Sequence, residues 1–284
     1  MSIDDRVEKW VFLNGSFYLE KEASIPVTDR GFLFGDGIFT TIRADQGKCE
    51  FLKAHLSRLR DHAAMLELEM NIDDKRLCGW ISELIEKQKA WDGVWRLKVI
   101  ITVREEGLRR EQGLVLLTLQ PYEEMKGKPC SLCVYPYPTE TPFSRIKSLS
   151  YLSNLSIGTY ARKKGCDDAV AISHEGFILE TGRSNLFWVD GGKCWIPDPS
   201  LPILKGIFLH SILPCLPYPI EPVKAKLEEI PLSANVFVCN SLSHVRPVVS
   251  VEGKVYQRNS KVEAALEKAI VMALEQDIFS PVSL

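Results

Sequence analysis

Short runs of alternating apolar and polar residues fill the first 120 positions, and turn signals separate them. The first run is broken by Asn14-Gly15, a dipeptide typical of a two-residue hairpin turn, so we expect a strand on either side. Between Leu56 and Leu66 the apolar spacing changes to three and four, which predicts a helix, and a second helix is expected from Lys75 to about Ala90. A charged loop is expected between the last two strands. The strands predicted in this half are 11–13, 16–19, 37–43, 49–52, 95–103 and 114–119.

A polar segment with proline and glycine, residues 121–129, interrupts this pattern and predicts a linker. Beyond it, helices are expected over Leu152–Lys164 and from about Val262 to Glu275. Hairpins dominate and there is no run of strand–helix–strand units, so the predicted class is α+β with largely antiparallel pairing. We expect a smaller domain over residues 1–120 and a larger one over 130–284. The strands predicted in the larger domain are 131–135, 169–173, 177–180, 185–189, 193–196 and 236–240.

Composition excludes several classes of protein without selecting one. The chain has 284 residues, with 35 Lys+Arg against 37 Asp+Glu. The resulting formal net charge of −2 gives no electrostatic reason to expect binding to nucleic acid or to an anionic membrane. No apolar run approaches the roughly 20 residues of a membrane span. The acidic N-terminus lacks an apolar segment, so we expect no signal peptide and a cytoplasmic location with reduced thiols. Cys130 and Cys133 have no second pair to complete a metal site, and we expect them to pack in a strand.

Four local patterns contain residues with chemical potential, each beside a plainer interpretation. Lys147 follows an apolar residue just before a predicted helix; a desolvated lysine near another cation forms Schiff bases, whereas a solvated one does not. Glu180 ends a strand five residues before Asn185, where a carboxylate either pairs with a protonated ring nitrogen or lies on the surface. Arg58 either reaches a phosphate or faces water. Gly206 precedes a possible helix, whose first N–H groups either bind a phosphate or form an ordinary helix start.

Taken in order, these segments resemble the fold-type IV pyridoxal-phosphate enzymes. This family includes branched-chain aminotransferases, D-amino-acid transaminases and aminodeoxychorismate lyases. The resemblance implies a two-domain α+β fold of the D-amino-acid aminotransferase type, with pyridoxal 5′-phosphate in the cleft between the domains. It also implies a homodimer. The motifs that carry it are D-R-G-F-L-F-G-D-G-I-F at 29–39, H-L-S-R-L at 55–59, I-K-S-L at 146–149, G-F-I-L-E-T-G-R-S-N-L-F at 176–187, I-L-K-G-I at 203–207 and C-N-S-L-S-H-V-R-P-V at 239–248.

The same resemblance implies roles for individual residues. Lys147 would hold the cofactor covalently and move the proton at the substrate carbon, and Glu180 would pair with the pyridine nitrogen. Arg58 would bind the phosphate. The family commonly has threonine where this chain has Phe208, so one hydroxyl donor is missing. We expect that loss to weaken cofactor retention by about 1.5–3 kcal/mol without abolishing it. The other cofactor contacts implied are Tyr151, Asn185, Leu204, Ile207, Phe208 and Ser241.

Two short segments are similar to the lyase branch of the family. Thr40-Thr41 stands where transaminases more often have glutamate first, and Asn240-Ser241-Leu242 matches a lyase-like ending. This similarity implies conversion of 4-amino-4-deoxychorismate to 4-aminobenzoate and pyruvate, with Thr41 as a catalytic proton donor. A small anionic amine substrate would then be bound by Arg43, Arg109 and Leu242. The alternatives are a class IV aminotransferase acting on branched-chain or D-amino acids, and a cofactor-binding protein with little turnover.

Overall fold

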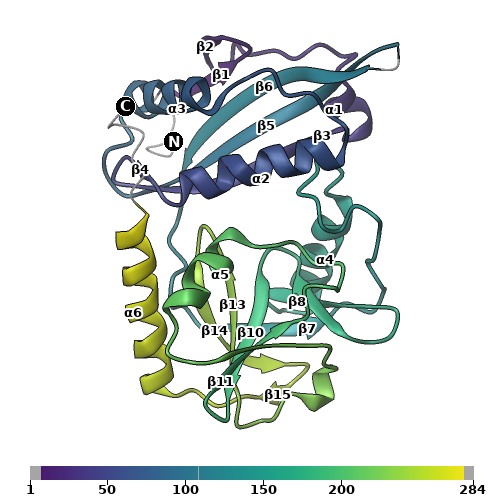
Figure 1. Cartoon of the computed structure of the whole chain (residues 1–284), viewed down its shortest axis with the longest axis vertical. Helices are drawn as coiled ribbons and strands as arrows, with labels where there is room; N and C mark the ends of the chain where they lie inside the picture. Colours follow the sequence, from purple (N-terminus) through teal and green to yellow (C-terminus); the bar gives the residue numbers. More distant parts are fainter. Residues whose placement is uncertain (1–7, 108, 278–284) are drawn as a thin grey trace. The chain divides into compact units, whose positions relative to one another are not determined.

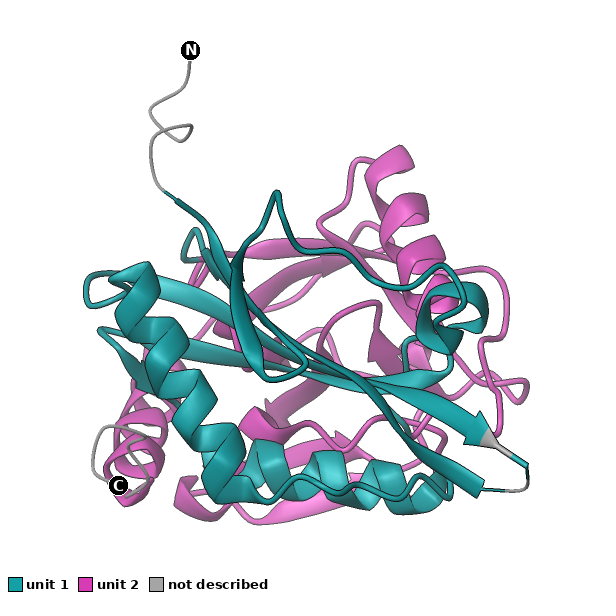
Figure 2. Ribbon diagram, turned by 90° about the horizontal axis from the view of Figure 1, so that it is seen from above, with its two compact units in different colours: residues 1–124, 146–150, 278–284 teal, residues 125–145, 151–277 magenta. Residues whose placement is uncertain are grey.

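The computed structural model describes residues 8–107 and 109–277, which divide into two compact units (Figure 2). The described part of unit 1 is 8–107, 109–124 and 146–150, and unit 2 is 125–145 and 151–277. The first division, after Glu124, falls inside the predicted linker. Lys147 belongs to unit 1 and not to the second unit, which differs from the predicted placement of this residue in the larger domain. The α+β class is confirmed.

Unit 1 is built on an antiparallel sheet that has six strands in the described part of the chain, in the order β2-β1-β6-β5-β3-β4. Asn14 and Gly15 connect β1 to β2 with φ angles of 48° and 98°. These positive values explain why the asparagine-glycine pair predicted this hairpin correctly. The strands are β1 (Trp10–Leu13), β2 (Ser16–Leu19), β3 (Gly37–Asp45), β4 (Lys48–Cys49), β5 (Val94–Glu106) and β6 (Arg109–Pro121).

Helices α2 (Leu52–Met65) and α3 (Asp74–Gln88) pack against this sheet, and a short α1 (Arg30–Phe34) precedes β3 (Figure 1). Alternate residues of β5, among them Leu97 and Val99, are buried in the same core as the apolar sides of α2 and α3. Successive side chains of a strand point to opposite faces, so the residues between them lie on the sheet face away from these helices.

The hairpin of β5 and β6 is longer than predicted. The segment expected to be a charged loop continues both strands, with Arg104 opposite Glu111 and Glu105 opposite Arg110. These pairs form ion pairs of 2.6 and 2.8 Å. Opposite charges facing each other across two strands stabilise the pairing, so this polar composition belongs to a hairpin and the loop prediction is wrong.

Unit 2 contains a mixed sheet, which has nine strands in the part of the chain described. The pairs β7–β8, β7–β14 and β11–β12 are parallel, and these were not indicated by the local pattern. Cys130 and Cys133 of β7 pack in the core, and burial raises the pKa of both thiols to about 12. The strand order is β12-β11-β10-β13-β14-β7-β8-β9, with β15 beside β14. The strands are β7 (Cys130–Val134), β8 (Asp168–Ile172), β9 (Ile178–Thr181), β10 (Asn185–Asp190), β11 (Lys193–Pro197), β12 (Ile220–Val223), β13 (Asn235–Asn240), β14 (His244–Val251) and β15 (Lys254–Val255).

The helices of unit 2 are α4 (Leu152–Lys163), α5 (Ile207–Ile212) and α6 (Ser260–Gln276), with 3-10 turns η2 (Leu213–Cys215) and η3 (Leu227–Glu229). The two long helices agree closely with the predicted ranges. Within residues 8–107 and 109–277, none of the helices has the length and apolar character needed to cross a membrane.

Candidate functional site

Lys147 lies on a short segment that pairs with the free edge of β3. Its carbonyl accepts a hydrogen bond from the Phe39 N–H at 3.0 Å, and the Leu149 N–H donates to the Gly37 carbonyl at 2.9 Å. The Lys147 Nζ lies 4.7 Å from the centroid of the Phe39 ring. The predicted reactive lysine is thus fixed to a strand and not carried on a solvated loop.

Thr41 and a second lysine, Lys98, lie on the same side of the sheet as the Phe39 ring. Thr41 is two residues from Phe39 on β3, so the two side chains share a face of the sheet, and Lys98 is the partner of Thr41 on β5. The Lys98 Nζ lies 5.6 Å from the centroid of the same Phe39 ring. Burial, with a smaller contribution from the charge of Arg96, lowers the pKa of Lys98. Sequence reasoning missed Lys98, although a lone lysine within an apolar strand was a usable signal.

Thr40, on the opposite face of β3, connects Arg58 to a buried histidine. An arginine only donates, so the Thr40 hydroxyl accepts from Arg58 Nη2 at 3.1 Å. The same hydroxyl forms a 2.6 Å hydrogen bond with His55 Nδ1, whose direction is set by the tautomer of the imidazole. Burial lowers the pKa of His55 well below its usual range, and the charges of Arg58 and Lys147 lower it further. His55 is therefore neutral, and its Nε2 is buried with no hydrogen-bond partner among the residues described.

A second histidine of α2, His62, contacts the backbone of Lys147. Its Nδ1 accepts from the Lys147 N–H at 3.1 Å. Burial, followed by the charges of Arg58 and Lys147, lowers the pKa of His62 to about 4. Neither histidine was among the predicted site residues. Their spacing was the missed signal, because His55 and His62 lie seven residues apart on the buried side of α2.

In unit 2, Glu180 on β9 is held by two donors. Its Oε2 accepts from Asn185 Nδ2 at 3.2 Å, and its Oε1 accepts from the Leu204 N–H at 3.3 Å. Asn185 Nδ2 also donates to the Leu204 carbonyl at 3.0 Å. A Cβ at Gly206 would overlap Asn185 Oδ1, so this arrangement requires glycine there. The structure brings together three residues that the sequence placed in one site: Glu180, Asn185 and Leu204.

The segment expected to bind a phosphate is the start of α5. The helix begins at Ile207 after the N-cap Gly206, and no described side chain caps it, so its first N–H groups face outward from the helix. Phe208 is only 1% exposed, and its ring stacks on His244 with centroids 4.6 Å apart. The residue that replaces the family's threonine therefore belongs to the core, and its side chain offers no hydroxyl donor.

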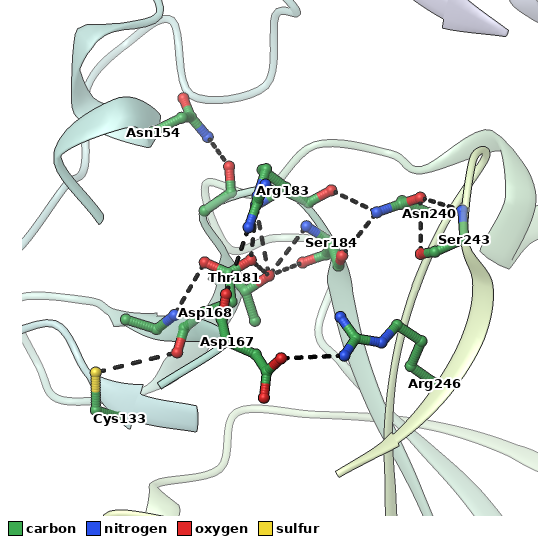
Figure 3. Close-up of polar contacts among 12 residues, drawn as sticks. Cys133, Asn154, Asp167, Asp168, Thr181, Arg183, Ser184, Asn240, Ser243 and Arg246 are labelled. Atoms are coloured by element: carbon green, nitrogen blue, oxygen red, sulfur yellow. Dashed lines mark hydrogen bonds and ion pairs between the residues drawn. The ribbon is translucent and has the colours of Figure 1, made fainter. Parts of the chain in front are cut away.

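A polar network fixes the turn that contains Ser241 (Figure 3). Asn240 Nδ2 donates to Ser184 Oγ at 3.0 Å, and Asn240 Oδ1 accepts from the N–H groups of Leu242 and Ser243 at 2.9 and 2.8 Å. One amide side chain thus connects the turn at 241–243 to the turn that precedes β10. Ser241 and Leu242, both predicted site residues, are placed by Asn240.

The same network continues to the residue that follows Glu180. Thr181 Oγ1 donates to Asp168 Oδ2 at 3.0 Å and accepts from the Ser184 N–H at 3.0 Å (Figure 3). Burial raises the pKa of Asp168, although the hydrogen bonds that it accepts and the Arg183 charge oppose this effect. These contacts fix the end of β9 and, with it, the backbone of Glu180.

Tyr151 stands at the start of α4, and its hydroxyl donates to the Gly182 carbonyl at 3.4 Å. Asn154 Nδ2 donates to the same carbonyl at 3.1 Å (Figure 3). Tyr151 is therefore next to the turn that follows Glu180 within unit 2.

Arg43 does not have the freedom to bind a substrate. Its side chain is 3% exposed and forms ion pairs with Asp45, Glu50 and Glu124 at 2.8, 3.2 and 2.6 Å. Three carboxylates form ion pairs with this buried guanidinium, which argues against its predicted role in substrate binding. Arg109 is exposed at the tip of the β5–β6 hairpin, opposite Glu106, and no contact in the described chain joins it to Lys147.

The residues present fit pyridoxal 5′-phosphate. Its aldehyde needs an amine, its pyridine nitrogen a carboxylate, and its phosphate a cation with N–H donors. Unit 1 contains an amine and a cation of this kind in Lys147 and Arg58, and unit 2 contains a carboxylate in Glu180 and uncapped N–H groups at the start of α5. Glu180 is held in one orientation by its two donors. No group of histidine, cysteine and acidic residues that could hold a metal occurs within the described ranges.

The sequence and the fold of this chain are similar to those of known proteins. Residues 37–251 match the model of a family described as amino-transferase class IV. A Methanocaldococcus jannaschii protein, whose name places it among branched-chain-amino-acid aminotransferases, is 28% identical over 255 residues, covering 86% of this chain and 88% of its own. The aminodeoxychorismate lyase of Bacillus subtilis is 25% identical over 276 residues, covering 88% and 89%. The solved branched-chain aminotransferase of Thermoproteus uzoniensis superposes with a TM-score of 0.86 at 21% identity, covering 95% and 96%.

The family match covers most of the chain, and its members depend on pyridoxal 5′-phosphate. The relatives' names divide between aminotransferases and a lyase. The chain belongs to the class IV aminotransferase family of pyridoxal-phosphate enzymes.

Proposed function

We propose that this protein is a pyridoxal-phosphate lyase that converts 4-amino-4-deoxychorismate to 4-aminobenzoate and pyruvate. The observation that carries the proposal is the grouping of Lys147, Lys98 and Thr41 around Phe39. This grouping supplies a base, a cation and a hydroxyl, and the lyase reaction uses all three. The name of the Bacillus subtilis relative supports the same activity.

The residues to which the family resemblance assigns cofactor contacts would hold the cofactor. The Lys147 amine would bind it covalently, and Glu180 would keep a proton on its ring nitrogen. Pyridoxal phosphate, when bound, withdraws electrons from the substrate carbon that carries the amine. Arg58 would bind the phosphate by charge-assisted hydrogen bonds. The other residues proposed to hold the cofactor are Tyr151, Asn185, Leu204, Ser241 and the backbone of Ile207 and Phe208.

Three side chains would act on the substrate. Lys147 would remove the proton from the ring carbon that carries the substrate amine. Loss of the enolpyruvyl group would then leave an aromatic ring. The Thr41 hydroxyl would give a proton to the departing fragment, which becomes pyruvate. Lys98 would bind a substrate carboxylate, a role that Arg43 cannot take because its guanidinium is occupied.

The second candidate is an aminotransferase for branched-chain or D-amino acids. It is favoured by the name of the Methanocaldococcus jannaschii relative. The same lysine and glutamate serve both reactions, so only the products distinguish them.

The deciding experiment incubates the purified protein and cofactor with aminodeoxychorismate, or with D-alanine or L-leucine plus 2-oxoglutarate. The lyase releases pyruvate and fluorescent 4-aminobenzoate in equal amounts, whereas an aminotransferase forms glutamate. Lys147→Ala should abolish the product and serves as the control for background reaction. Glutamate formation without pyruvate release from aminodeoxychorismate would refute the lyase.

The homodimer implied by the family resemblance stays a proposal. Exposed apolar side chains on α1 support it, since Phe32 and Phe34 are each 64% exposed. The molar mass in solution, measured by light scattering, tests this proposal, and a monomer at micromolar concentration would contradict it.

A further inference from the structure

His62 contacts the reactive lysine and has no part in the chemistry proposed above. It lies in the last turn of α2 and is 5% exposed. A backbone N–H only donates, so His62 Nδ1 is the acceptor in its 3.1 Å contact with Lys147, and the ring proton is on Nε2. An apolar side chain would suffice for packing at this position. An acceptor is needed at this position only because the Lys147 N–H points at it, in a contact that is partly buried.

The backbone of Lys147 is held from two sides. Its carbonyl accepts from the Phe39 N–H of β3 at 3.0 Å, and its N–H donates to His62 of α2 at 3.1 Å. A helix and a strand thus hold the two peptide units on either side of the Lys147 Cα. The amine of a lysine is separated from its backbone by four flexible methylene groups of fixed total length. A displaced backbone would therefore change the positions that the Nζ can reach beside the Phe39 ring.

We propose that His62 is a positioning residue for Lys147, which fixes the lysine backbone through a neutral imidazole so that the amine reacts from one place. The inference rests on the proposed function, because it takes Lys147 as the residue that binds the cofactor. Reaction rates are sensitive to displacements of about 1 Å in such a group. His62 does not touch the reacting atoms, and its effect is transmitted through the Lys147 backbone.

Three variants of the full-length protein separate this role from simple packing. His62→Leu keeps an apolar side chain of similar size and leaves the Lys147 N–H without its acceptor. His62→Asn restores an acceptor, because the amide oxygen of asparagine occupies nearly the position of Nδ1. Ile81→Val removes one methyl group from the same core, on α3, and controls for loss of stability alone.

Two measurements report on Lys147 without using turnover. Hydrogen exchange of the Lys147 amide reports the contact itself. Reduction with borohydride after mixing with pyridoxal phosphate, followed by mass spectrometry of the modified peptide, reports how fast the amine binds the cofactor. We expect His62→Leu to accelerate the exchange and to slow the modification, each by on the order of tenfold. His62→Asn should restore both rates, and Ile81→Val should change neither.

The inference is overturned if His62→Leu leaves both rates unchanged, or if Ile81→Val reproduces its effects. It is also overturned if His62→Asn behaves like His62→Leu. Failure of the proposed lyase activity is a different result, because it is seen in the products and an aminotransferase would still be modified at Lys147. A wild-type protein that shows no modification at Lys147 at all would remove the premise that this lysine binds the cofactor.

Discussion

Replacement of Gly206 by alanine tests whether the Glu180 site depends on a close backbone contact. Gly206 has φ −71° and ψ 125°, a conformation that alanine adopts without strain. The effect of the substitution therefore comes from the new Cβ, which would overlap Asn185 Oδ1. The overlapping atom is the end of a side chain, so Asn185 would relieve the clash by rotating away.

The cost of that rotation follows from the hydrogen bonds it breaks. Asn185 Nδ2 donates to the Glu180 carboxylate at 3.2 Å and to the Leu204 carbonyl at 3.0 Å. A hydrogen bond to a charged group contributes about 1.5–3 kcal/mol and a neutral one about 0.5–1.5 kcal/mol. The lower chain entropy of unfolded alanine offsets about 0.4–1 kcal/mol of this loss. We expect Gly206→Ala to lower the free energy of unfolding by about 2 kcal/mol, since both side chains are only partly buried.

The assay is denaturant unfolding of the cofactor-free protein, with Gly158→Ala as the matched control. Gly158 lies within α4 of the same unit, and a Cβ there would approach only Arg162 Nη1, at 3.9 Å. That variant should gain about 0.5–1 kcal/mol, as expected for alanine in a helix. In an Asn185→Ala background, Gly206→Ala should cost nothing more, because the clash has been removed. An equal loss in both backgrounds would refute this explanation.

Three further predictions concern unit 1. Thr40→Val leaves the contacts to Arg58 and buried His55 unmade and should cost about 1–3 kcal/mol in denaturant unfolding, while Thr40→Ser should not. The pKa of His62 falls from 6.5 to about 4 on folding, so the unfolded chain binds more protons between these values and stability should rise with pH across that window. Its contribution is on the order of 2 kcal/mol after allowance for solvent screening, and urea titrations of His62→Asn should show a shallower pH slope; an unchanged slope would contradict this. Lys98→Met should raise KM for an anionic substrate at least about tenfold while borohydride still fixes the cofactor to the protein; an unchanged KM would exclude Lys98 from substrate binding.

Local chemistry explains which parts of the fold were predictable. The turn at Asn14-Gly15 has positive φ angles, which asparagine and glycine adopt readily, so its residues indicated it. The long helices have apolar residues at helical spacing, and their predicted limits are close to those observed. In each case the determining interactions lie within a few residues of one another.

Non-local contacts explain what was missed. Strand β7 lies between β8 and β14, and residues such as Cys130 pair with partners more than a hundred positions away in the sequence. Lys147 belongs to unit 1 because residues 146–150 pair with β3, although the flanking chain belongs to unit 2. Nothing in the local pattern of either segment indicates these partners.

In the candidate site, too, the residue types could be seen in the sequence, whereas the surroundings that decide their chemistry could not. Arg43 and Lys98 are both cations on neighbouring strands, and only the carboxylates around Arg43 decide which one is available. The two buried histidines are kept neutral mainly by desolvation and also by the charges of Arg58 and Lys147. A phosphate bound at Arg58 would offset part of that charge and raise the pKa of both histidines. Burial is the larger cause and is not removed by the phosphate, so both rings should stay neutral at pH 7 with cofactor bound. His62 would then remain an acceptor for the Lys147 backbone, which is the state that the proposed chemistry requires.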